Sequence, residues 1–504
     1  MTIDFCNAGA LAILFRIVAF LLLLSPSVTG QTELTYVVQY TNEQSALIHV
    51  QIVAASVDKS PITFVMPRAI PSGYGQQPYD RFVEHVKATS TKGMSLKVQK
   101  ENGPRWRITG PDIGKVEYDV DLLRLEREIL DASAASKERS GYVGLLGYSV
   151  FGYLEDLEDL PIRLEVKAPQ GWPVFTTLSP KAPAETTGTF AEAKNFYELA
   201  DSQIAMGPKL EVHRLPTPLP LFLAIYYEVD TDVTKHGQIF ADAFLKVLSY
   251  FAIAPFDHYT AYIEILKPIS DRHDYGFSME HLTSSTYFLG SDRAITNTTT
   301  SQDLEIERFN FAHHVTHSWI PKQVYGTGYM PFSWELAPQI DTIWFNEGFA
   351  RYVAIEAVAD AMPETQAERF RQKHLDNLKN ILGSMPGFIR SMPLVQLSRI
   401  GSLMYSEDFR TGVTLFSKGA LMAAEMDQVI RRQTHGRKRL RDALRALVSW
   451  GEHSRRAFRI EEFSGLIARP VGVNEQSIRA VMNRWLKVAK GKGLGHDRTP
   501  SSTL

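Results

Sequence analysis

Two histidines four residues apart, His313 and His317, are the side chains of this sequence best placed to act together on a ligand. On an α-helix such a pair lies on one face, so both imidazoles can reach the same metal ion. The spacing alone also fits an ordinary pair of partly buried histidines, and on these two residues both interpretations stay open.

Glu347 favours the metal interpretation. The segment Trp344-Phe345-Asn346-Glu347-Gly348-Phe349 places a carboxylate among large apolar residues. A carboxylate in such surroundings needs a cationic partner, and a zinc ion held by two histidines and one glutamate is such a partner. Three protein ligands leave a fourth position open, as in catalytic zinc sites. An ion pair with Arg351, one helical turn later, is the alternative partner for Glu347, and it can coexist with metal binding.

His314 occupies the position where the zinc-hydrolase motif has a glutamate. That glutamate removes a proton from the attacking water, and a positioned base of this kind contributes about 10²–10⁴-fold to the rate. A neutral imidazole also accepts a proton, but it then becomes a cation beside the metal. His314 therefore acts as an unusual base, turns toward the metal or packs as a core residue.

The elements around these histidines can be predicted from local patterns. Thr300 and Asp303 form a capping box that should begin a helix, and Pro321 should end it. A second helix should run over residues 341–361, and almost all of residues 364–487 should be helical. The first helix should bury one stripe of apolar side chains, Phe311, Val315 and Trp319.

Upstream of the helices the pattern is different. Residues 34–178 contain short alternating or β-rich runs broken by Pro and Gly, which is typical of an all-β domain of sandwich type. The stretch 180–187, rich in Pro, Ala and Thr, predicts a boundary loop. Residues 275–281 read as a turn followed by an apolar strand with one acid, Glu280.

Composition restricts the possible partners and the compartment. The chain of 504 residues has 54 Lys and Arg against 56 Asp and Glu, so no excess of positive charge predicts a nucleic-acid partner. Arg16 and the apolar run 17–24 predict a signal peptide over residues 1–30, with a retained membrane anchor as the alternative. The single cysteine, Cys6, lies inside that segment, so we expect a secreted or periplasmic bacterial protein without disulfides and without stable membrane insertion after cleavage.

Several segments in order resemble the glycyl aminopeptidase family of thermolysin-like (gluzincin) zinc metallopeptidases. The likeness runs through most of the chain after the signal segment. The segments that carry it are 64–67 with 73–74 and 79–83, the linker-like 196–202, Gly276 with Glu280 and His281, the helix residues His313, His317 and Trp319, and the turn residues Trp344, Glu347 and Gly348.

The resemblance implies a role for each matched position. His313, His317 and Glu347 would hold one zinc ion, and Glu280, with Gly276 on the same strand, would bind the free amino group of a peptide. His314 stands at the position of the general base. Phe416, which precedes Lys418-Gly419, stands at the position of the tyrosine that stabilises the oxyanion.

The resemblance also implies the fold and its division. We expect an α+β multidomain protein with an N-terminal antiparallel β-sandwich domain, a thermolysin-like catalytic domain and a C-terminal helical domain. The expected division is a signal peptide at 1–30, the β domain at 31–185, the zinc domain at 186–362, the helical domain at 363–488 and a disordered tail at 489–504. Many family members carry a peptide-binding PDZ module, and nothing after residue 487 is long enough to form one.

Two functions are carried forward. The first is an exported pseudo-peptidase that keeps the zinc and binds a peptide or protein N-terminus, with weak or no hydrolysis because His314 and Phe416 replace two catalytic groups. The second is an active zinc aminopeptidase that removes small N-terminal residues with His314 as its base. A protein of the same fold without any metal is the third and plainest possibility.

Overall fold

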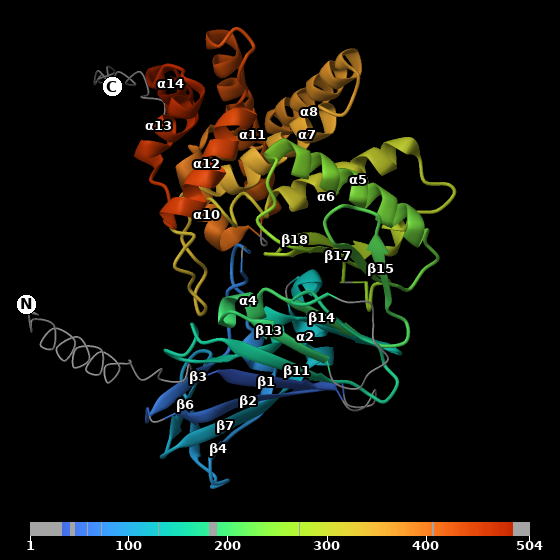
Figure 1. Ribbon diagram of the computed structural model, residues 1–504, viewed down its shortest axis with the longest axis vertical. Coiled ribbons are helices and arrows are strands. Elements are labelled where there is room, and N and C mark those ends of the chain that lie inside the picture. The colour runs from blue at the N-terminus through green and yellow to red at the C-terminus, as the bar shows by residue number, and fades with distance from the viewer. Residues whose placement is uncertain are drawn as a thin grey trace, which may run out of the picture.

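The computed structural model describes residues 33–40, 46–57, 59–71, 73–129, 131–180, 189–271, 273–405 and 408–486. The predicted signal peptide with Cys6, the predicted tail and the predicted domain boundary at residue 186 lie outside these ranges. Within them the chain has β-sheets in its N-terminal part and helices in its C-terminal part, so the predicted α+β class is confirmed (Figure 1).

The N-terminal part contains three sheets. The largest has six strands in the order β13 (Thr189–Ala193), β11 (Ile162–Lys167), β1 (Leu34–Gln39), β2 (Leu47–Val57), β7 (Ile113–Asp121) and β4 (Val83–Ser90). The second consists of β10 (Tyr153–Leu154), β3 (Ile62–Val65), β6 (Arg105–Thr109) and β5 (Lys97–Lys100), and the third of β12 (Val174–Thr176), β14 (Gln203–Met206), β9 (Tyr142–Leu146) and β8 (Lys137–Arg139).

One pair of strands departs from the predicted antiparallel arrangement. β1 and β11 run parallel, with Leu34 opposite Ile162 and Gln39 opposite Lys167. The long connection between them allows this, because parallel neighbours need a crossover rather than a tight turn. β13 and β14 follow residue 186 in the chain, and both pair within these N-terminal sheets.

A five-stranded sheet lies between the N-terminal sheets and the helices (Figure 1). Its order is β15 (Glu211–Leu215), β16 (Leu221–Tyr227), β17 (Tyr259–Leu266), β19 (Ser284–Gly290) and β18 (Gly276–Glu280), so β18 is an edge strand. Its two faces belong to different hydrophobic cores. On β19, for example, Tyr287 and Leu289 pack into the helical core, whereas Phe288 packs into the core of the N-terminal sheets.

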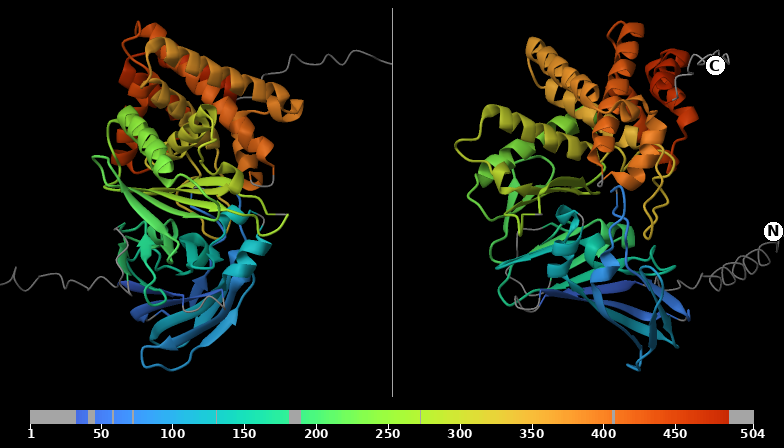
Figure 2. Two further views of the ribbon diagram at one scale, coloured as in Figure 1. Left: turned by 90° about the vertical axis from the view of Figure 1, so that its right-hand side faces the viewer. Right: turned by 180° about the vertical axis from the view of Figure 1, so that it is seen from behind.

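The helices on the far face of this sheet form the upper half of the molecule in Figure 1, and Figure 2 shows the same layers from two other sides. They are α5 (Val233–Phe251), α6 (Ser301–Thr316), α7 (Ala350–Ala359), α8 (Glu364–Ser384), α9 (Gly387–Ser391), α10 (Leu394–Met404), α11 (Phe409–Gln433), α12 (Leu440–Ser454), α13 (Ile460–Val471) and α14 (Glu475–Leu486). Three short helices lie among the N-terminal sheets, α2 (Leu122–Glu128), α3 (Gly147–Val150) and α4 (Phe196–Ala200).

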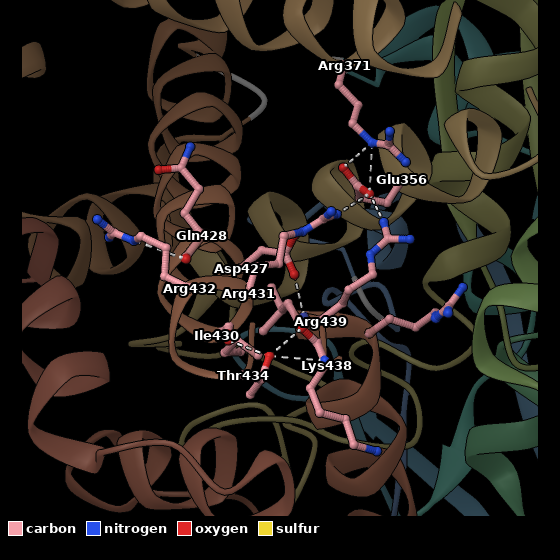
Figure 3. A network of polar contacts seen from close by, with 12 residues as sticks. Glu356, Arg371, Asp427, Gln428, Ile430, Arg431, Arg432, Thr434, Lys438 and Arg439 are labelled. Atoms are coloured by element: carbon pink, nitrogen blue, oxygen red, sulfur yellow. Dashed lines mark hydrogen bonds and ion pairs between the residues drawn. The ribbon is translucent and has the colours of Figure 1, made fainter. Parts of the chain in front are cut away.

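A network of ion pairs joins four of these helices at the end of α7 (Figure 3). Glu356 on α7 accepts hydrogen bonds from Arg371 on α8 and from Arg439 before α12, and it forms an ion pair at 3.5 Å with Arg431 on α11. Asp427 pairs with Arg431 at 2.6 Å. The Arg-rich stretch around residue 431 is therefore partly an internal connection between helices.

A second buried network joins the N-terminal part to the layer that carries the histidines. Asp201, just after α4, accepts from Lys322 at 3.1 Å and pairs with His281 at 3.0 Å, and each of these three side chains is 1% exposed. Burial lowers the pKa of Lys322, but Asp201 together with Tyr329 and Glu280 more than offsets it and raises that pKa above its ordinary value. Leu282 N–H donates to the second oxygen of Asp201.

In the described part of the chain, no helix combines the length and the apolar character that a membrane crossing requires.

The substitution Asp201→Asn should lower the free energy of unfolding by about 3–5 kcal/mol, because it removes the buried charge that is paired with the ammonium of Lys322. Chemical denaturation of the two proteins measures the difference. Asp376→Asn, which breaks the exposed pair with Lys379, is the matched control and should leave the midpoint unchanged. Equal midpoints for both variants would contradict the assignment of the Asp201 network.

Candidate metal centre and peptide cavity

The predicted capping box begins α6, and it places the histidines at the other end of the helix. Thr300 Oγ1 accepts from Asp303 N–H, and the Asp303 carboxylate accepts from Thr300 N–H. The predicted apolar stripe of α6 is buried. The helix ends at Thr316, however, and not at Pro321, because the backbone tightens into turns after that residue. His317 is thus the first residue beyond the helix.

That position gives His317 a partner for one of its ring nitrogens. Its Nδ1 lies 2.9 Å from the carbonyl oxygen of Ile320, and since a carbonyl only accepts, Nδ1 is the donor. The proton on Nδ1 leaves Nε2 with a free lone pair. Histidine ligands of metal sites are usually oriented by a bond of this kind.

Glu347 lies on a π-helical turn, Trp344–Phe349, which precedes α7. The sequence predicts one continuous helix from Asp341, and that prediction is wrong at its start. The turn is held by α11, whose Gly419 backbone lies directly against Gly348. A Cβ on Gly348 would lie only 2.3 Å from Gly419 Cα, so neither position has room for a side chain. π-Helical turns are frequent at functional sites.

The three predicted ligands converge. His313 Nε2 lies 3.3 Å from His317 Nε2, and Glu347 Oε2 lies 3.5 Å from the first nitrogen and 3.6 Å from the second. Zinc bonds of about 2.0–2.1 Å in a tetrahedron place neighbouring ligand atoms about 3.3–3.4 Å apart. The donor set and its spacing therefore fit one zinc ion.

A second set of possible ligands, Glu280, His314 and His317, overlaps the first. Its pairs are longer, 3.8 Å from His314 Nδ1 to Glu280 and 3.9 Å from His317 Nδ1 to Glu280. The second of these pairs uses the nitrogen that already donates to Ile320. The set His313, His317 and Glu347 is therefore the better site for a cation.

Burial controls the electrostatics of the site. It lowers the pKa of His313 well below its ordinary value, reinforced by the neighbouring His317 and His314, so that His313 stays neutral and able to bind a metal. Burial also raises the pKa of Glu347, although His317 opposes the shift. A divalent cation between these groups would stabilise the ionised carboxylate.

A tyrosine from the N-terminal part completes the surroundings of Glu347. Tyr74 Oη donates to Glu347 Oε1 at 2.7 Å, across 273 positions of the sequence. The family resemblance places Tyr74 in a motif of the β domain, and it predicts no contact between Tyr74 and the metal site. No local pattern could have revealed this contact, because it depends on how the N-terminal sheets pack against α7.

Glu280 and His314 form a neighbouring pair. Glu280 ends β18, and its side chain is 7% exposed. Burial raises the pKa of Glu280, but His317, His314 and Lys322 more than offset it and hold that pKa below its ordinary value. His314 is turned toward Glu280, and its Nδ1 has no hydrogen-bond partner in the described part of the chain.

A cavity of about 210 Å³ connects these groups. Both parts of the molecule line it, with Tyr74 from the N-terminal part, Gly276 and Glu280 from β18, and His313, His314 and Glu347 from the helical part. Phe416 also lines it, and its ring packs edge-on to His313 with centroids 5.8 Å apart. The structure thus brings every predicted site residue except His317 to the wall of one cavity, and His317 lies directly beside His313.

Two further cavity residues do not follow from the sequence. Tyr405 lies against Tyr74 and Phe416, with ring centroids 4.9 and 6.0 Å apart. Arg351 forms no ion pair with Glu347, so the alternative predicted from their spacing is wrong. Its guanidinium instead lies over the rings of Phe309 and Phe416, at 4.8 and 5.8 Å from their centroids.

The N-terminal part matches a known family, and most of the chain shares its fold with solved structures. Residues 35–208 match the family model of the Peptidase M61 N-terminal domain. No curated protein matches the chain.

Among solved structures, an aminopeptidase N family protein from Idiomarina loihiensis superposes with a TM-score of 0.77 at 17% identity, over 89% of this chain and 75% of that one. Yeast LTA4 hydrolase superposes with a TM-score of 0.55 at 13% identity, over 92% and 70%. The M1 zinc metallopeptidase of Deinococcus radiodurans does so with a TM-score of 0.51 at 12% identity, over 89% and 93%. The fold is that of the M1 aminopeptidase-like zinc metallopeptidases.

Zinc binding should depend on both His317 and Tyr74. We expect one zinc per chain, loss of that zinc in His317→Ala, and a 10–100-fold weaker affinity in Tyr74→Phe, as is usual when a group that orients a ligand is removed. Competition with a chromophoric chelator measures the affinities. Tyr325→Phe, a tyrosine outside the site, is the control. If Tyr74→Phe and Tyr325→Phe bind zinc equally well, Tyr74 does not orient Glu347.

Proposed function

We propose that this chain is an exported, zinc-binding, aminopeptidase-like protein that holds a peptide N-terminus and hydrolyses it weakly or not at all. The proposal assigns it to a divergent branch of the glycyl aminopeptidase family. Its main support is the contrast within one cavity: the three ligand atoms are spaced for zinc, whereas the two positions expected to move a proton and stabilise an oxyanion hold His314 and Phe416.

Each residue has a role in this proposal. His313, His317 and Glu347 hold the zinc, which when bound would polarise a peptide carbonyl. The Glu280 carboxylate accepts hydrogen bonds from the peptide ammonium group. Since its pKa lies below the ordinary value, Glu280 stays ionised for that purpose. Phe416 has no hydroxyl to donate to an oxyanion.

The expected loss of rate is large. A general base contributes about 10²–10⁴-fold and one oxyanion donor about 10²–10³-fold. If the two effects were independent, the rate would fall on the order of 10⁴–10⁷-fold, although such contributions are rarely additive. Binding requires neither group, so recognition of a peptide can persist where turnover has been lost.

A second function, an active aminopeptidase, is favoured by two features of the cavity. His314 Nδ1 has no hydrogen-bond partner in the described residues and can accept a proton. The phenol of Tyr405 lines the same cavity beside Phe416. Rapid hydrolysis of glycyl and alanyl chromogenic amides by the zinc-loaded chain, abolished in His317→Ala, would establish this function and refute the first.

The location outside the cytoplasm is part of the proposal. It is supported by the basic residue and apolar run near the N-terminus, which lie outside the described residues. Detection of the mature chain in the periplasm or the medium of the producing bacterium tests it.

Peptide binding should depend on Glu280 and on a free amino group. We expect the zinc-loaded chain to bind alanyl-alanine amide, and to lose at least ~10-fold in affinity when the peptide is N-acetylated or in Glu280→Gln, because a charged hydrogen bond disappears in each case. Isothermal titration calorimetry measures both effects. Asp292→Asn, an exposed acid elsewhere in the sequence, is the control. Equal affinity for acetylated and free peptides would exclude recognition of the N-terminus.

Restoring the two groups should restore hydrolysis. We expect His314→Glu with Phe416→Tyr to raise the rate on alanyl amides by at least ~10²-fold over the unsubstituted chain, because both catalytic functions return to an intact zinc site. The same double variant with His317→Ala should be inactive. No gain in the zinc-loaded double variant would show that the site lacks more than these two groups.

A further inference from the structure

Arg351 is a cation in the cavity, and among the described residues its guanidinium has no directly paired carboxylate. It follows Glu347 by one helical turn on α7, and it lines the same cavity as Glu280 and Glu347. Its guanidinium lies over two aromatic rings, those of Phe309 and Phe416. Within the described residues it makes no hydrogen bond, and no carboxylate lies within 4.0 Å of it.

Two other enclosed arginines among the described residues are paired with carboxylates. Arg139, 13% exposed, reaches Glu126 at 2.6 Å and Glu228 at 2.9 Å. Arg371, 17% exposed, reaches Glu356 at 3.0 Å. Charged groups removed from water are costly unless they are paired. Arg351 has no carboxylate paired with it in the described structure, and an anionic ligand would supply this partner.

The surroundings of Arg351 restrict the kind of anion. A guanidinium presents its donors in a planar fork that matches the two oxygens of a carboxylate. The aromatic rings hold the flat group in place through stacking and cation–π contact. The cavity is small, about 210 Å³, and its lining carboxylates are those of Asp131, Glu280 and Glu347. Glu347 belongs to the zinc site, and Glu280 is the group that the proposed function assigns to the peptide ammonium. A ligand that satisfies both Arg351 and Glu280 carries an ammonium group and a carboxylate.

We propose that Arg351 binds a carboxylate of a short peptide whose ammonium group is held by Glu280. The inference rests on the proposed function and narrows it to peptides that carry a negative charge close to their N-terminus. The carboxylate is either the α-carboxylate of a dipeptide or an acidic side chain at the second position. Phe416 then contributes its ring as a platform for Arg351.

Calorimetry with the zinc-loaded full chain and four peptides tests the inference. Alanyl-alanine is compared with alanyl-alanine amide, and alanyl-glutamate amide with alanyl-glutamine amide. We expect the charged member of at least one pair to bind about 10–100-fold more tightly, since a hydrogen bond to a charged group is lost in its neutral counterpart. A preference in the first pair identifies an α-carboxylate, and a preference in the second identifies an acidic side chain.

Substitutions assign the preference to one residue. Arg351→Gln should abolish it while the neutral amides bind as before, and Arg351→Lys should retain part of it. Arg369→Gln, an exposed arginine on α8 without an ion pair in the described structure, should change nothing.

The outcomes separate the two proposals. Equal binding within both pairs, with the amides still bound, overturns the role of Arg351 and leaves recognition of the N-terminus intact. A preference that survives Arg351→Gln also overturns it. Failure of all four peptides to bind the unsubstituted, zinc-loaded chain overturns both proposals.

Discussion

The turn that carries Glu347 and the helix that carries Phe416 touch backbone to backbone at Gly348 and Gly419. Neither position has room for a Cβ, because the nearest main-chain atoms would lie 2.3 Å away. The contact sets the distance of Glu347 from His313 and His317, and it also brings residue 416 to the edge of His313. The ligand atoms and the wall of the cavity therefore depend on the same pair of glycines.

The N-terminal sheets take part in the site as well as supporting it. Tyr74 reaches from them to the carboxylate of Glu347, and Asp201, buried with Lys322, ties them to the layer behind the histidines. Because each contact is buried and charged or hydrogen-bonded, its loss leaves an unsatisfied group inside the protein. Both parts of the chain therefore contribute residues to the surroundings of the candidate metal centre, although its three ligands come from the helical part alone.

Local patterns predict much of this arrangement. The four-residue spacing of His313 and His317, the capping box at Thr300 and the apolar context of Glu347 correctly predict which side chains meet. The sequence could not show the π-helical turn or the end of α6 at Thr316, because close packing with α11 and the bond from His317 to Ile320 decide them. The contact of Tyr74 with Glu347 and the surroundings of Arg351 depend on contacts between distant segments. Helical spacing predicts an ion pair between Arg351 and Glu347, which is wrong, and it predicts nothing about Tyr74.

The five-stranded sheet has one face in each hydrophobic core, so that Tyr287 and Phe288, neighbours in the chain, anchor opposite halves of the molecule. Bending one half against the other would pull apolar side chains of this shared layer into water. The shared sheet therefore opposes rotation of one half of the molecule against the other. Since the cavity has walls from both halves, rotation of one half against the other would disturb the packing of both cores. The shape of the cavity therefore depends on the packing of both cores.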